Sequence, residues 1–157
     1  MSDMLVNLLK LPHDPALFQR LSEDGVRIFR ALTPDQIAVT EWVRAQFGKQ
    51  AAGECMAAFA RQPVACILAA RGRTLLGYAC YDATYRNFFG PTAFLESERG
   101  KGIGRALLLT ALGSMRDVGY AYAIIGGVGP AAFYEKTVGA VLIPDSTPGV
   151  YCDFLQL

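Results

Sequence analysis

The feature that most constrains this chain is a glycine-rich segment between a predicted strand and a predicted helix. Gly100, Gly102 and Gly104 follow an apolar run that ends at Leu95, and they precede a helical pattern that begins at Arg105. Glycines let consecutive backbone N–H groups converge, and the positive end of the following helix dipole adds to the same field. Such a turn binds anions, typically a pyrophosphate. The alternative is a tight turn with a solvated basic surface.

Basic side chains in the segment favour the anion-binding interpretation. Arg99, Lys101 and Arg105 lie close together along the chain. A nucleotide P-loop would need GxxxxGK followed by Ser or Thr, but Gly100 and Lys101 are followed by Gly102. A dinucleotide fingerprint that starts at Gly102 would need glycine or alanine where this chain has leucine. The segment therefore predicts a pyrophosphate site of another kind.

The composition is typical of one globular domain. The chain has 157 residues, of which 52% are hydrophobic, and this excludes a disordered protein. Fifteen basic and fourteen acidic residues give a net charge near +1, so we expect no nucleic-acid partner. No segment approaches the roughly 18 apolar residues of a membrane span. No basic region precedes the apolar residues 4–11, so we expect no signal peptide, no membrane partner and a cytoplasmic location.

The cysteine spacing predicts no metal site. Cys55, Cys66, Cys80 and Cys152 are far apart in sequence, no CxxC pair occurs, and the lone histidine, His13, lies in a proline-flanked turn. This pattern lacks the spacing of zinc ligands. We therefore expect reduced cysteines that pack as small hydrophobic side chains.

Hydrophobic periodicity predicts strands and helices in an α/β (α+β) sandwich. Residues 1–24 read as an N-terminal extension, a strand plus a short helix, that covers a sheet edge or builds a dimer interface. Strands are expected at 26–31, 64–70, 74–83, up to 92–95, at 120–125, 140–143 and 150–155, and helices at 33–47, 53–61, 105–118 and 130–138. Pro91 must lie at a strand start or at an irregularity. Since the elements neither alternate strictly nor segregate, we expect a mixed sheet.

The pattern Arg99-x-x-Gly102-x-Gly104 resembles the acetyl-CoA loop of the GNAT superfamily of acyl-CoA-dependent N-acetyltransferases. The resemblance includes the flanking strand and helix and the segment 132–136, and it covers a domain at residues 25–157. It implies a mixed, mostly antiparallel central sheet flanked by helices, with two strands splayed at an acyl-CoA cleft.

The resemblance also implies the residues that bind acetyl-CoA. Loop amides would hold the pyrophosphate, the preceding strand would pair with the pantetheine arm, and the Leu95 N–H would stabilise the oxyanion. The implied set is Phe94, Leu95, Arg99, Gly100, Lys101, Gly102, Ile103, Gly104 and Arg105. Tyr134 matches the tyrosine that protonates the leaving thiolate, although a tyrosine there could equally pack in the core.

The reaction also needs a base and an acceptor site, because a free alkylamine with a pKa of about 10.4 is protonated at neutral pH. Glu96, just past the strand end, is the first candidate base and Asp82 the second; each could equally be a surface acid. Tyr81, Asp82 and Tyr85 are candidates for the acceptor site. The expected function is transfer of the acetyl group of acetyl-CoA to a primary amine of a small molecule, an amino acid or an amino sugar, by direct attack on the thioester. The protein is expected to be a monomer or a homodimer.

Two departures from the family pattern leave alternatives open. A glycine-rich segment at 126–130 replaces an Asn-containing entry to the last helix, and Gly139 falls one residue late after Tyr134. These departures leave open the alternative that the chain is a CoA-binding domain without catalytic activity. Gly127 and Gly129 also fit, with Ala132, the G-x-G-x-x-A motif of a dinucleotide-binding oxidoreductase, although few residues follow for a doubly wound sheet.

Overall fold

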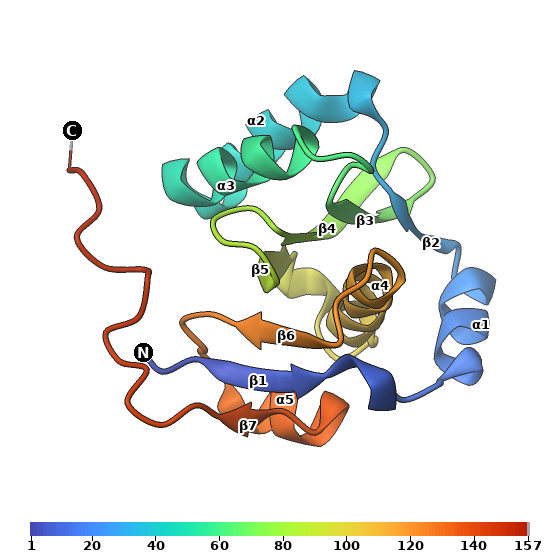
Figure 1. The fold of residues 1–157 in the computed structure, drawn as a ribbon. Helices are drawn as coiled ribbons and strands as arrows, with labels where there is room; N and C mark the ends of the chain where they lie inside the picture. The colour runs from blue at the N-terminus through green and yellow to red at the C-terminus, as the bar shows by residue number, and fades with distance from the viewer. Residues whose placement is uncertain (157) are drawn as a thin grey trace.

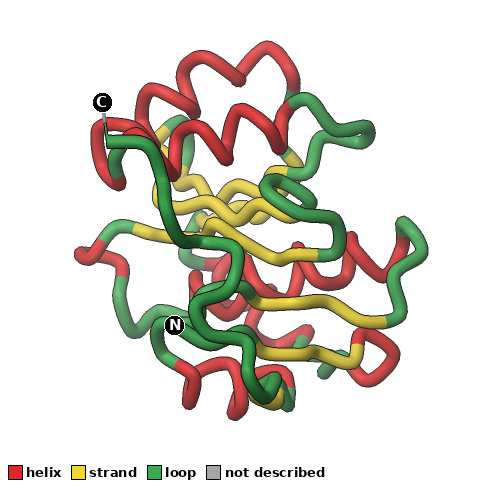
Figure 2. Tube along the Cα trace, turned by 60° about the vertical axis from the view of Figure 1, so that its left-hand side comes forward, coloured by secondary structure: helices red, strands yellow, loops and turns green. Residues whose placement is uncertain are grey.

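The computed structural model describes residues 1–156 as one sheet with helices on both faces (Figures 1 and 2). The strands are β1 (Met4–Asn7), β2 (Val26–Arg30), β3 (Cys66–Arg71), β4 (Thr74–Tyr81), β5 (Phe88–Phe94), β6 (Tyr122–Ile125) and β7 (Val141–Leu142). The helices are α1 (Pro15–Glu23), α2 (Gln36–Phe47), α3 (Lys49–Phe59), α4 (Ile103–Asp117) and α5 (Ala131–Val138). None of these described helices is long and apolar enough to span a bilayer.

The sheet has the strand order β2-β3-β4-β5-β6-β1-β7. Neighbouring strands are antiparallel throughout the described chain, except for the parallel pair β5 and β6. This confirms the predicted fold class, a mixed and mostly antiparallel sheet flanked by helices. Pro91 of β5 lies opposite the register shift between Ala79 and Tyr81 of β4. This agrees with the expected irregularity, because proline has no N–H to donate to the neighbouring strand.

Two helical layers enclose the core. On one face, the α2 aromatics Trp42 and Phe47 pack on Tyr78 of β4, with ring centroids 6.5 Å and 5.8 Å away. On the other face, α4 packs along β3, β4 and β5. Its apolar residues recur at helical spacing, and Leu107, Leu112 and Met115 are among those fully buried. The sheet is therefore held between an α2–α3 layer and α4, which follows the glycine-rich loop.

The N-terminal segment belongs to the sheet rather than to its edge. β1 lies between β6 and β7, antiparallel to both, with the side chains of Met4 and Val6 fully buried. α1 then packs against β2 and α4. The alternation of buried Met4 and Val6 with partly buried Leu5 and Asn7 is typical of a strand with one face in the core.

The predicted last strand at 150–155 is wrong. That segment forms no strand, and Gly149 and Asp153 have φ of 73° and 58°, which interrupts an extended conformation. The two left-handed residues turn the chain, so that an extended run cannot form between them. The segment instead runs from β7 past the N-terminus toward the level of α3 (Figure 1).

Candidate active site

The candidate site begins where β5 and β6 separate. The two strands pair only at Phe88 with Ile124 and at Phe89 with Ile125. β5 continues to Phe94, whereas the chain after β6 turns into the loop at 126–130. In the described chain, β5 beyond Phe89 therefore has no strand partner on its β6 side. A cavity of about 610 Å³ lies there, bounded by β5, the loop before α4, and α5.

The glycine-rich loop has the backbone geometry that an anion cradle requires. Gly100 and Gly102 have φ of 77° and 88°, in the left-handed region that favours glycine, and Gly102 directly precedes α4. The N–H groups in the first turn of α4 have no intrahelical partner. A Cβ at Gly104 would lie 2.7 Å from Cε1 of Phe94, which also lines the cavity. The third glycine therefore lets the β5 ring approach the helix closely.

Most of the residues that the family resemblance implies for acetyl-CoA binding line this cavity. Its walls include Phe94, Arg99, Gly100, Gly102, Ile103, Gly104 and Arg105. Leu95 and Lys101 do not line it.

The three cations near the loop differ in how far they are already paired. Arg105 Nε donates to Asp14 Oδ2 at 2.9 Å, and Lys101 Nζ donates to Glu98 at 3.0 Å. Arg99 has a side chain 74% exposed, with only a 3.5 Å contact to the equally exposed Glu96. Exposed ion pairs of this kind contribute little to the free energy of folding. Arg99 is therefore the cation most available to a phosphate.

Helix α1 braces the loop from outside. A Cβ at Gly102 would lie 2.6 Å from Leu17 Cδ1, so the glycine makes room for that leucine. Arg20 Nη1 donates to the Lys101 carbonyl at 2.9 Å. Asp14 caps α1 by accepting from Leu17 N, and the hydrogen bond from Arg105 lowers the pKa of its carboxyl. The sequence analysis missed this support because its residues lie about 80 to 90 positions from the loop.

Glu98 anchors the strand-side end of the loop. Its buried carboxylate accepts two hydrogen bonds from Arg71, at 3.1 and 3.2 Å, and one from Lys101. The hydrogen bonds from Arg71, and to a smaller extent the one from Lys101, hold the pKa of Glu98 below its usual value. The result is a loop base held by three hydrogen bonds, with the negative charge of Glu98 balanced by Arg71 and Lys101.

The predicted oxyanion donor is wrong. The Leu95 N–H donates to the Leu76 carbonyl at 2.8 Å, so it is occupied within the sheet. Successive residues of an antiparallel strand direct their N–H groups to opposite sides. Given this register, the N–H groups of Thr92 and Phe94 face away from β4, toward the gap with β6. These are the β5 donors in position to contact a ligand in the cleft.

Tyr134 lies on the boundary between two cavities. It lines the 610 Å³ cavity and also a second one of about 470 Å³. Its ring packs edge-on against Phe89 and Phe133, at 6.4 and 5.1 Å between centroids. Burial raises the pKa of its hydroxyl, so it stays protonated near neutral pH. Gly139, with φ of 65°, ends α5 after Tyr134, and the late position of this glycine leaves the tyrosine in the cleft.

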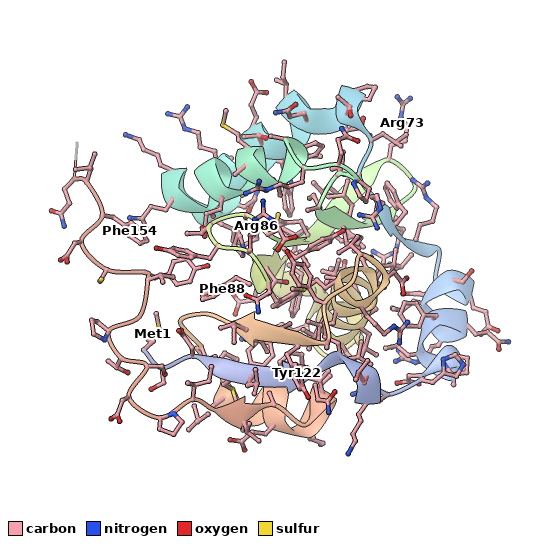
Figure 3. All side chains as sticks on the ribbon, viewed as in Figure 1. Met1, Arg73, Arg86, Phe88, Tyr122 and Phe154 are labelled. Carbon is pink, nitrogen blue, oxygen red and sulfur yellow. The ribbon has the colours of Figure 1, made fainter. Side chains whose placement is uncertain are left out.

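The second cavity is formed by α3, β5, the loop at 126–130 and the C-terminal segment. It shares Phe89, Thr92, Pro130 and Tyr134 with the first cavity. Met1 and Phe154 also line it, and they lie on the same side of the molecule in Figure 3. Glu54 of α3 contributes the carboxylate among its lining residues. The sequence analysis missed Glu54, because a single acid on a helix carries no motif.

The predicted base and acceptor residues lie elsewhere. The Glu96 side chain is 85% exposed and lines neither cavity of the cleft. Tyr81 and Asp82 line a separate cavity of about 180 Å³, where Tyr81 accepts from Arg30 and Asp82 accepts from Tyr120. Tyr85 is exposed and packs against Phe88. The structure therefore does not bring these residues to the cleft.

The backbone of the loop at 126–130 is hydrogen-bonded to the N-terminal residues. The Gly127 N–H donates to Asp3 Oδ1 at 2.8 Å, and the Val128 N–H donates to the Ser2 carbonyl at 2.9 Å. Amides used in this way are unavailable to a dinucleotide pyrophosphate. The mostly antiparallel sheet also differs from the doubly wound parallel sheet of such enzymes. The oxidoreductase alternative is therefore excluded.

Three of the cysteines meet in the core despite their separation in sequence. Cys55, Cys66 and Cys80 come from α3, β3 and β4, and their sulfur atoms lie within 4.8 Å of one another. All three are free thiols buried in the core, while Cys152 is exposed. The spacing argument overlooked this cluster because Cys66 and Cys80 are cross-strand partners and α3 packs over both strands.

The chain belongs to the Acetyltransferase (GNAT) family, whose profile matches residues 28–140. This confirms the resemblance. No curated protein matches the chain.

Solved structures share the fold at low sequence identity. A GCN5-related glucosamine N-acetyltransferase region of a fungal multi-domain β-N-acetylglucosaminidase superposes with a TM-score of 0.74 at 11% identity, over 90% of this chain and 19% of that one. A GCN5-related N-acetyltransferase from Sphaerobacter thermophilus gives 0.64 at 18% identity, over 90% and 48% of the two chains. A GNAT family N-acetyltransferase from Escherichia coli in complex with CoA gives 0.54 at 20%, over 72% and 67%. The chain thus spans about a fifth of the length of the first of these proteins and about half of the length of the second.

Proposed function

We propose that this protein is an N-acetyltransferase that uses acetyl-CoA as the donor and a small-molecule primary amine as the acceptor. The observation that carries the proposal is the meeting of two cavities at Tyr134, Thr92 and Phe89. One cavity has the glycine-rich loop with Arg99 and Arg105, and the other has Glu54, which is paired with no cationic side chain in the described chain. Each reactant can therefore enter from its own side and meet the other at the tyrosine.

The donor fits the first cavity by its chemistry. The first-turn amides of α4 and the Arg99 guanidinium would bind the pyrophosphate. The outward N–H groups of Thr92 and Phe94 would pair with the pantetheine arm, which adds to β5 as a strand would. A thioester carbonyl near Thr92 would receive one of these N–H groups as its oxygen gains negative charge.

Tyr134 would act as the acid of the reaction. The acceptor ammonium first loses a proton to water, and its nitrogen then attacks the thioester carbon. The C–N bond forms and the C–S bond breaks as the Tyr134 hydroxyl protonates the departing sulfur. The new amide nitrogen gives up its second proton, which restores the phenol through water. The products are the N-acetyl amine, CoA thiol and one released proton.

We keep the predictions of a cytoplasmic location and of a monomer or homodimer without nucleic-acid or membrane partners. Free cysteines are consistent with a reducing compartment, and a net charge near +1 gives no basic excess for nucleic acid. Glu96 is not part of the proposed mechanism, because its exposed side chain lies outside both cavities.

The experiment that tests the proposal measures CoA thiol release from acetyl-CoA with a panel of primary amines. Tyr134→Phe should lower kcat by about tenfold to a hundredfold and leave the acetyl-CoA dissociation constant unchanged, because it removes a proton donor and keeps the ring. Tyr120→Phe is the matched control, since that hydroxyl donates to Asp82 outside the cleft. Acetyl-CoA binding without transfer to any amine would instead indicate a CoA-binding domain without catalysis.

A further inference from the structure

The acceptor-side cavity has walls suited to an apolar body. Seven of the residues around its volume of about 470 Å³ carry aromatic or proline rings. These residues are Phe47, Phe89, Pro91, Pro130, Tyr134, Tyr151 and Phe154. Tyr151 packs so closely on the loop after β6 that a Cβ at Gly126 would lie 2.6 Å from its Cε2 atom. The rings enclose a space for an aromatic or aliphatic group rather than for a strongly hydrated one.

The charged side chains of this cavity have one sign. Among its described lining residues, Glu54 has the sole ionisable carboxylate and no Lys, Arg or His is present, while Met1 contributes the backbone α-amino group at the rim. Behind the loop, the buried carboxylate of Asp3 accepts from the Gly127 N–H. Burial, together with the nearby Glu54 carboxylate, raises the pKa of Tyr151 to about 12. The cavity therefore attracts cations and repels anions.

Glu54 is held in place without losing its charge to a cation. It projects from α3 and is half-buried, and it accepts a hydrogen bond from the Thr84 hydroxyl in the loop before β5. No Lys or Arg forms an ion pair with it in the described chain. A hydroxyl donor satisfies one lone pair and leaves others for an ammonium group. Glu54 thus resembles a prepared counter-ion for an incoming amine.

From this arrangement we propose that the acceptor is an amine with an aromatic or aliphatic body and no acidic group, drawn into the cavity by Glu54. The inference rests on the proposed transferase function and narrows it. An α-amino acid is disfavoured, because its carboxylate would meet Glu54 and find no cationic side chain in the cavity. An amino sugar is disfavoured because its hydroxyl groups would lose hydration against the rings without enough polar partners.

The experiment compares two acceptors that differ by one carboxylate, 2-phenylethylamine and L-phenylalanine, with glucosamine as a third. Thiol release is measured at saturating acetyl-CoA. Wild-type kcat/KM should be at least about tenfold higher for 2-phenylethylamine than for either other compound, because like charges in contact cost that much or more. Equal or better use of L-phenylalanine or glucosamine would overturn the inference and leave the transferase function standing.

Variants at Glu54 test whether its carboxylate causes the preference for an acceptor without an acidic group. Glu54→Gln should raise KM for 2-phenylethylamine, and Glu54→Lys should reverse the preference toward L-phenylalanine. Glu41→Gln, an exposed acid on α2, is the matched control and should change neither. Calorimetric titration should give all three variants the wild-type affinity for acetyl-CoA, since Glu54 does not line the donor cavity.

The outcomes separate the two proposals. An unchanged preference in both Glu54 variants would overturn the role of Glu54. Acetyl-CoA binding with no acetylation of any amine would overturn the proposed function and this inference together.

Discussion

The two sides of the cleft are built in opposite ways. The donor side rests on regular elements: α4 follows the glycine-rich loop directly, α1 braces the loop through Leu17 and Arg20, and Glu98 fixes its base. The acceptor side rests on an irregular loop and a C-terminal segment without strand or helix. The pyrophosphate is common to all reactions that use CoA, whereas acceptors differ. Under the proposed function, the side built from regular elements would serve the constant reactant and the irregular side the variable one.

The largest expected effect comes from filling the close contact on the donor side. Gly104→Val would push a side chain against Phe94, whose ring lies 2.7 Å from the position of a Cβ and lines the donor cavity. The acetyl-CoA dissociation constant should rise about fivefold to a hundredfold, since overpacking of this kind typically costs about 1–3 kcal/mol. Isothermal calorimetry measures the change.

Gly113→Ala is the control for that substitution. It lies on the same helix, and a Cβ there meets nothing within 4 Å. It should bind acetyl-CoA as the wild type does. Wild-type affinity in Gly104→Val as well would remove the loop from the donor site.

A matched substitution on the acceptor side should have a smaller and different effect. A Cβ at Gly126 would lie 2.6 Å from Tyr151 and 2.8 Å from Phe88. Because Tyr151 lies in an irregular segment that can shift, Gly126→Val should raise the amine KM by only about threefold to tenfold. The acetyl-CoA affinity should stay unchanged. A loss of donor affinity equal to that in Gly104→Val would show that the two sides are not independent.

The smallest expected effect concerns the pH dependence of the loop base. Because Arg71 and Lys101 lower the pKa of Glu98, its stabilising contribution is present above the usual value of 4.5 and is lost as the pH falls through the lowered pKa. Glu98→Gln should reduce the free energy of unfolding at pH 7 by roughly 1–2 kcal/mol, as loss of a hydrogen-bonded charge does. The difference from wild type should vanish in strong acid.

Glu96→Gln is the control for the stability measurement. Its carboxylate is exposed and only weakly paired, so neither stability nor turnover should change. A loss of turnover in this variant would restore Glu96 as a candidate base. A pH-independent difference between Glu98→Gln and wild type would contradict the ion-pair network.

The sequence identifies the glycine-rich loop on one side of the cleft but not the residues that line the other side. Three closely spaced glycines next to basic residues describe a local structure, because neighbouring residues form the whole loop. The Leu95 amide was misassigned because strand alternation depends on a register with β4 that one sequence does not reveal. Glu54 and Tyr151 come from segments about a hundred residues apart, and only tertiary packing brings them to one cavity.

The N-terminal segment illustrates the same limit. Its apolar alternation predicts a strand, but nothing in residues 4–7 specifies the slot between β6 and β7. The predicted strand at 150–155 is absent as well, and Tyr151 and Phe154 of that segment line the acceptor cavity. Both the place of β1 and the composition of this cavity depend on tertiary packing that the local pattern does not reveal.

The central claim is that the gap between β5 and β6 is an acetyl-CoA site, and calorimetric titration of the protein with acetyl-CoA tests it most directly, with NADH as the control ligand. The account predicts one acetyl-CoA bound per chain with micromolar affinity, weakened in Gly104→Val and unchanged in Gly126→Val, and no binding of NADH. Failure to bind acetyl-CoA, or tighter binding of NADH, would contradict it.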